Sequence, residues 1–176
     1  MLRKLRKYRL FLVSLTIAIN IAIAFSFPIF ALNFNSQELQ AKNEMISILK
    51  AQEYYGLKFN KFAKNLTALK LKVKSNYYDY KILSIEERKI FITGKAQRKG
   101  LKSYIGGAGF FNYASDREPM IVVSIICVSK KPTKIIPEKP NLSLHTELPR
   151  ASCGINSEEV CSNISPLDYE RNCWKK

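Results

Sequence analysis

The chain has 176 residues, of which 47% are hydrophobic, and it carries a formal net charge of +15. This length suits one globular domain and excludes two full ones, while the apolar content is sufficient for a compact core. A lone histidine argues against Ser-His-acid or Cys-His catalysis, since both need a positioned base.

The N-terminal segment has the pattern of a membrane anchor or a signal. Its first nine residues, MLRKLRKYR, hold five basic and no acidic side chains. An apolar run over residues 10–32 follows, which exceeds the roughly 20 residues that a spanning helix needs. The basic head predicts a cytoplasmic N-terminus. The run is therefore a retained single-pass anchor in the cytoplasmic membrane, or a secretory signal cleaved to leave a secreted or periplasmic protein; both place the domain outside.

Residues 36–55 are predicted to form one long amphipathic helix. They contain no proline or glycine, and their inward positions recur at steps of three and four. Gly56 is expected to stop this helix. A second helical turn over residues 58–69 is expected to fold back and cover its aromatic end. The side chains predicted to form the core between this helical region and a sheet are Met45, Ile48, Gln52, Tyr55, Phe59 and Phe62.

The pattern then changes from helical to alternating. In residues 76–85, NYYDYKILSI, the side chains of Tyr78 and Tyr80 point one way and their neighbours the other, which predicts a strand with one buried face. KIFITGKAQ, residues 89–97, alternates in the same manner and is predicted to be its antiparallel partner.

The rest of the chain gives weaker patterns. Glycine-rich residues 98–113 are predicted to be a loop with one short strand, and no Gly-Lys-Ser/Thr follows to make it a phosphate-binding loop. Residues 120–129 are nearly all apolar, as in a strand covered on both faces. The proline-containing residues 130–176 are expected to be loops stapled by cysteines.

The four cysteines, Cys127, Cys153, Cys161 and Cys173, form an even set in the last third of the chain. An oxidising compartment would allow two disulfides. Zinc is the alternative, but no two cysteines lie two to four residues apart, so we expect no metal and no cofactor. Four cysteines allow three pairings. The working assignment, a guess, is Cys127 with Cys153 and Cys161 with Cys173.

The charge beyond the apolar run predicts attraction to polyanions. Residues 33–176 hold 24 basic and 14 acidic side chains, or +10, which suits nucleic acid or acidic polysaccharide. Tyrosines among lysines are a candidate binding surface for such polymers; alternatively, the tyrosines simply close the sheet over the helix. No small-molecule substrate is evident. The candidate binding residues are Lys72, Lys74, Tyr77, Tyr78, Tyr80, Lys81, Lys102 and Tyr104.

In this order of elements the chain resembles type IV pilin-like proteins, in particular the G/H group named after the pseudopilins of general secretion. The resemblance lies in AKNEMISILKAQEYYGLKFNKFAKNLTALKLKV, YYDYKI, LKSYIGGAGF and IICVS. It implies an α+β fold, in which a long amphipathic helix packs on a small antiparallel sheet and a disulfide-bearing tail follows. The expected organisation is a basic head (1–9), an anchor or signal (10–32), a pilin-like domain (33–129) and a tail (130–176).

The resemblance also implies a function. Such a protein is a membrane-anchored structural subunit, not an enzyme, and it acts by contacts with other pilin-like or secretion subunits in a type IV pilus or a type II secretion apparatus. The rival hypothesis is a secreted or anchored basic module that binds DNA or acidic polysaccharide. Prepilins are cut after a glycine that precedes a phenylalanine, whereas this chain has no glycine before Gly56 and no acidic residue before Glu38. The resemblance therefore supports the fold and the envelope setting, and leaves entry into a filament open.

Overall fold

A computed structural model describes residues 36–73, 75–86, 88–111, 121–144 and 149–163. From Gln37 onward these residues belong to one compact unit. The predicted head and apolar run, residues 1–32, lie outside the described residues. Within the part of the chain that is described, no helix is long and apolar enough to cross a membrane.

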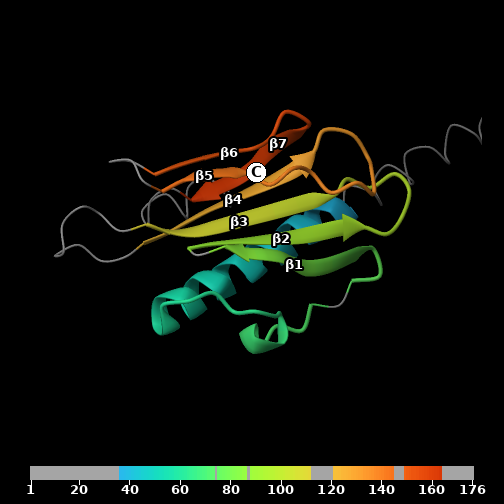
Figure 1. The fold of residues 1–176 in the computed structure, drawn as a ribbon. Coiled ribbons are helices and arrows are strands. Elements are labelled where there is room, and N and C mark those ends of the chain that lie inside the picture. The colour runs from blue at the N-terminus through green and yellow to red at the C-terminus, as the bar shows by residue number, and fades with distance from the viewer. Residues whose placement is uncertain (1–35, 74, 87, 112–120, 145–148, 164–176) are drawn as a thin grey trace, which may run out of the picture. The chain divides into compact units, whose positions relative to one another are not determined.

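The described unit contains a helix over residues 36–59, one short 3-10 helix and seven strands (Figure 1). Five strands form one sheet in the order β1-β2-β3-β4-β7, and every neighbouring pair in it is antiparallel. Strands β5 and β6 form a separate two-stranded sheet. The elements are η1 (Thr67–Leu69), β1 (Tyr78–Glu86), β2 (Lys89–Ala96), β3 (Tyr104–Phe111), β4 (Ile121–Ser129), β5 (Asn141–Ser143), β6 (Arg150–Ser152) and β7 (Ser157–Asn163).

The predicted helix, hairpin and buried apolar strand are confirmed, as is the α+β class in so far as a helix packs on an antiparallel sheet. The hairpin joins β1 to β2 from Tyr78 opposite Ala96 to Glu86 opposite Lys89, with a bulge between Ile82 and Ser84. Strand β4 is buried along its whole length, as its unbroken apolar sequence predicts.

The helix continues to residue 59, so the prediction that Gly56 stops it is wrong. Glycine is needed there for a close contact. A Cβ atom at position 56 would lie 2.7 Å from the ring of Phe110, a residue of β3. The change of direction follows the helix, at Asn60, whose φ is 52°. Asparagine adopts this left-handed conformation more readily than most residues.

The predicted helical turn over residues 58–69 is also wrong, because beyond the end of the helix at residue 59 only η1 within it is helical. The returning chain is fixed by side chains. The amide of the buried Gln52 donates to the carbonyl oxygen of Ala63 at 3.1 Å and accepts from its N–H at 2.9 Å. Phe62 stacks on Phe110, with 4.2 Å between ring centroids. The segment after the helix therefore attaches to the helix and to β3 with few regular backbone bonds.

The glycine-rich stretch that the sequence predicts as a loop is β3, a central strand that is buried throughout. Its small residues let layers approach from both sides. On the helix side, a Cβ at Gly106 would lie 3.1 Å from both Leu49 and Met45. On the other side, a Cβ at Gly107 would lie 2.8 Å from Pro140. Glycine weakens a strand but permits such close approach. Because these glycines are typical of loops, the sequence did not predict a strand here.

The predicted tail of loops is corrected over residues 130–163, which add three strands to the unit. Strand β7 pairs with β4 in the main sheet. Strand β5 covers the sheet face opposite the helix, where Leu142 packs in a cluster with Phe91, Ile105, Ile125 and Cys127. This apolar contact gives residues 130–163 a core, which their proline-rich and polar sequence did not indicate.

Candidate interaction surface

Three of the tyrosines predicted for binding are buried and do not form a surface. Tyr78, Tyr80 and Tyr104 are 4%, 9% and 4% exposed. The ring of Tyr78 lies 6.2 Å from that of Tyr80 and 5.8 Å from that of Tyr104, measured between centroids. The alternative interpretation therefore holds for these side chains: they fill the space between the sheet and the helix.

Two of their hydroxyl groups fasten the sheet to the first turns of the helix. Tyr80 donates to the carbonyl oxygen of Ala41 at 3.4 Å, and Tyr104 donates to that of Glu38 at 3.2 Å. Burial raises the pKa of Tyr78, Tyr80 and Tyr104 above the ordinary value. Burial thus favours the protonated form in which the hydroxyls of Tyr80 and Tyr104 donate these two hydrogen bonds.

Two of the other predicted binding residues, both lysines, are already paired with carboxylates. Lys81 pairs with Asp79 at 2.7 Å, and Lys102 pairs with Glu158 at 2.9 Å. Tyr77 is half-buried, and the guanidinium carbon of Arg98 lies 4.6 Å from its ring centroid. Lys72 is exposed, and Lys74 lies outside the described residues.

The predicted helix–sheet core is mostly in place. Met45, Ile48 and Gln52 are fully buried and Phe62 is 5% exposed, while Tyr55 is half-buried. The prediction that Phe59 belongs to this core is wrong, because 49% of the residue is exposed. It occupies the last helical position, and its ring lies against that of Tyr55 at 4.6 Å instead of against the sheet.

A different basic surface, which the sequence analysis missed, lies on the returning chain. We call residues 54–72 the lysine-rich segment. No acidic residue occurs between Glu53 and Asp79. Exposed apolar side chains accompany the charges, above all Tyr54 and Phe59, which are 68% and 49% exposed. Its exposed lysines are Lys58, Lys61, Lys64, Lys70 and Lys72. The sequence shows this run of lysines without acidic residues. Its apolar residues recur at helical spacing, however, and the segment was therefore predicted to be a helical turn.

Glu53, just before this segment, gives a pH-dependent prediction. Burial raises the pKa of its carboxyl above 4.5, although Lys50 opposes the shift. The ionised form is thus disfavoured in the folded state, so this group's stabilising contribution is present below pH 4.5 and lost as pH rises through the raised pKa. We expect Glu53→Gln to melt at a higher temperature than the parent at pH 7, with no gain at about pH 3.5.

Thermal unfolding monitored by circular dichroism at both pH values measures this. Glu159→Gln is the control, since Glu159 is exposed and its substitution changes the net charge equally. A Glu53→Gln variant that melts at or below the parent temperature at pH 7 would contradict burial as the dominant effect.

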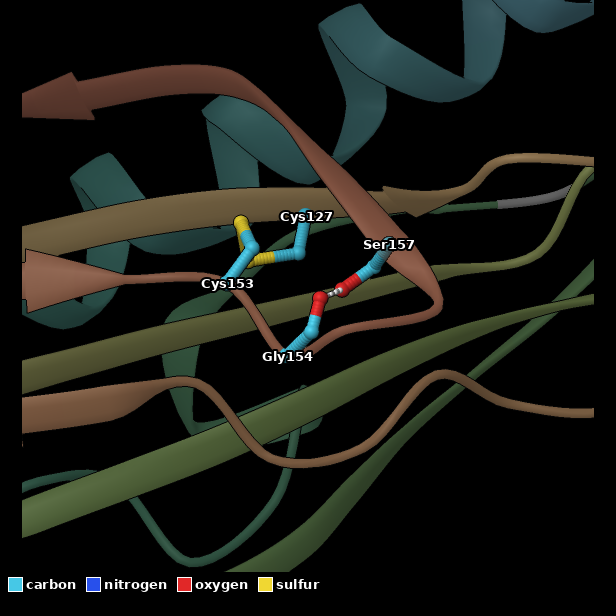
Figure 2. Close-up of a disulfide and its surroundings, with 4 residues drawn as sticks. All are labelled: Cys127, Cys153, Gly154 and Ser157. Carbon is cyan, nitrogen blue, oxygen red and sulfur yellow. Dashed lines mark hydrogen bonds between the residues drawn. A yellow bond between two sulfur atoms is a disulfide. The ribbon is translucent and has the colours of Figure 1, made fainter.

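The predicted Cys127–Cys153 disulfide is present (Figure 2), with 5.7 Å between the Cα atoms. It joins β4 to the residue that follows β6. Next to it a tight turn is closed by Ser157, whose hydroxyl and N–H both donate to the carbonyl oxygen of Gly154, at 3.0 and 3.1 Å. The disulfide thus attaches the covering β5–β6 layer to the main sheet. Cys173 and the side chain of Cys161 lie outside what the structure describes, and that pairing stays a prediction.

The described residues hold no group of acidic, histidine and cysteine side chains suited to a metal. A pocket of about 470 Å³ lies beside the chain that leaves β4. The hydroxyl of Ser129 in its lining already donates to the carbonyl oxygen of Lys131 at 2.9 Å. The pocket is lined by Ser129, Lys130, Lys131, Thr133, Ile135, Ile136, Pro137, Glu138 and Asn156. The lining of this pocket contains no histidine that could act as a base for Ser129.

Comparison with models of protein families gives a match. The model of the type IV pilin-like G and H family matches residues 38–154, from the first turns of the helix to the residue after Cys153. No curated protein and no solved structure matches the chain significantly.

Proposed function

Because the chain belongs to the type IV pilin-like G and H family, we propose that it is a membrane-anchored, extracytoplasmic structural protein of a type IV pilus or a type II secretion apparatus. A structural, pilin-like role follows from the family. The anchor, the compartment and the apparatus are the proposed parts. Support for the anchor comes from the apolar residues 10–32, whose length and basic flank fit a single span with the N-terminus in the cytoplasm.

The observation that carries the proposal is the division of the helix into a buried and an exposed face. Ala41, Met45 and Ile48 are buried against the rest of the unit. The opposite stripe, at four-residue spacing, consists of the exposed Leu39, Asn43 and Ser47. Leu39 is 54% exposed although it is apolar. A helix that keeps one face free is suited to contact another helix of the same kind.

Site-specific photo-crosslinking in the native membrane tests this proposal. A photoreactive residue at position 39, 43 or 47 is expected to give adducts with a second copy or with another pilin-like subunit. Ile155, which is 85% exposed and lies between β6 and β7, is the control position. Adducts at position 155 alone, or none at the three helix positions, would remove the helix as the contact face.

The intact mass and N-terminal sequence of the native protein, under non-reducing conditions, test the anchor separately. A full-length chain in the membrane fraction is expected. A chain that begins near residue 25 or 32 and is released from the membrane would instead identify a cleaved signal, and the anchored role would be wrong.

A further inference from the structure

We propose that the lysine-rich segment, residues 54–72, is a binding site for single-stranded nucleic acid. Its lysines would contact phosphates, and the exposed rings of Tyr54 and Phe59 would stack on bases. This activity is independent of the proposed structural role, since it uses the end of the helix and the returning chain and leaves the stripe of Leu39, Asn43 and Ser47 untouched.

The first argument is unneutralised charge. Three lysines elsewhere in the unit have carboxylate partners: Lys81 pairs with Asp79, Lys102 with Glu158 and Lys139 with Glu86. Among the described residues, the five lysines of the segment make no ion pair. Five exposed cations within one stretch of chain, without carboxylate partners, attract a polymer with regularly spaced negative charges, because phosphate contacts release condensed counterions.

The second argument is the exposure of aromatic rings within this charge. Tyr54 is 68% and Phe59 49% exposed. Phe59 is oriented by the ring of Tyr55 at 4.6 Å, and the ammonium of Lys58 lies 5.4 Å from its centroid. Aromatic rings beside lysines are the feature with which proteins bind unpaired bases. A duplex keeps its base faces stacked, so this feature favours a single strand.

The third argument concerns the rival polymer, an acidic polysaccharide. Sugar hydroxyl groups both donate and accept hydrogen bonds, so a site that satisfies them needs acceptor side chains as well as donors. The segment contains no carboxylate. Among its amides, Asn65 already accepts from the N–H of Ala68 at 2.8 Å. The surface thus offers donors and apolar rings, which match phosphates and bases better than sugar hydroxyls.

The segment is also fixed in place. The two hydrogen bonds between Gln52 and Ala63 hold it near its middle. Asn60 and Lys70 adopt left-handed conformations, with φ of 52° and 55°. Figure 1 shows the chain leaving the helix, passing through η1 and returning to the start of β1. Lysines on a fixed path lose less freedom on binding than lysines on a mobile one.

The test uses the full chain, purified in detergent, and a fluorescent oligothymidylate of about 20 nucleotides, with binding followed by anisotropy. We expect binding that weakens with salt, with a slope of about −0.7 in log K against log salt for each phosphate contacted. The variant Lys58→Gln/Lys61→Gln/Lys64→Gln should bind at least about tenfold more weakly and flatten the slope by roughly 2.

The matched control is Lys95→Gln/Lys99→Gln/Lys134→Gln, which removes the same charge from exposed lysines outside the segment. Its affinity should stay within about twofold of the parent. Phe59→Leu keeps an apolar side chain but removes the ring, and should weaken binding without changing the salt slope. Every variant alters only exposed or half-exposed side chains, and an unchanged melting temperature confirms that each is folded.

Several outcomes would overturn the inference. Equal losses in the two triple variants would show that only net charge matters. Binding of a DNA duplex or of a polyuronate as tightly as oligothymidylate, with no effect of Phe59→Leu, would assign the segment to polyanions in general. Absence of measurable binding at low salt would remove the site altogether.

Discussion

Replacing Phe62 with alanine is expected to lower the free energy of unfolding by about 3–5 kcal/mol, the usual cost of truncating a buried aromatic side chain. Phe62 is 5% exposed. Its ring stacks on Phe110 at 4.2 Å with 12° between the planes. Truncation would leave a cavity between the returning chain and β3, and the fixed position of the neighbouring Ala63 prevents the backbone from filling it.

Phe59→Ala is the matched control, three positions earlier in the chain. Because Phe59 is 49% exposed, its truncation should cost less than about 1 kcal/mol. Chemical unfolding of both variants, followed by circular dichroism, measures the two effects. Similar losses in the two variants would show that burial at these positions is assigned incorrectly.

The second large effect is expected from removing the Cys127–Cys153 disulfide. The bond closes a loop with a sequence separation of 26, and the loop-closure entropy for that length corresponds to about 3.5 kcal/mol. The double variant Cys127→Ala/Cys153→Ala should lose stability by this order, and the covering layer of β5 and β6 should detach from β4 first.

Hydrogen exchange resolved by mass spectrometry measures the local part of this effect. Amides of β5 and β6 should exchange much faster in the double variant, while those of the β1–β2 hairpin should change only with global stability. A loss below about 1 kcal/mol, or uniform acceleration over all strands, would show that the apolar cluster around Leu142 holds the layer without the disulfide.

The sequence predicted the elements that bury only one face. Met45 and Ile48 repeat with the helical period, and Tyr78 and Tyr80 with the strand period, because their opposite neighbours meet water. Strand β3 is covered on both faces, so it has no alternation, and its glycines imitate a loop. Strand β5 has only three residues, too few to show a period.

The candidate site was predictable only in part, for a related reason. Alternation placed Tyr78 and Tyr80 on one face, but the sequence does not show what covers a face, and here the helix does. Phe59 and Phe62 have helical spacing, which hid the change of direction at Asn60. That turn separates the buried ring of Phe62 from the exposed ring of Phe59. The lysines of the segment are exposed on either side of it.

The position of β7 in the sequence has a consequence for folding during synthesis. Strand β4 is the most apolar strand, and its partner on one side, β7, begins only at Ser157, three residues beyond the region matched by the family, which ends at 154. Because the chain is synthesised from its N-terminus, one edge of β4 therefore stays open until β7 appears. An open apolar edge pairs readily with any available strand. Until its own β7 has been synthesised and has paired with β4, the nascent chain can therefore exchange strands with a neighbouring chain.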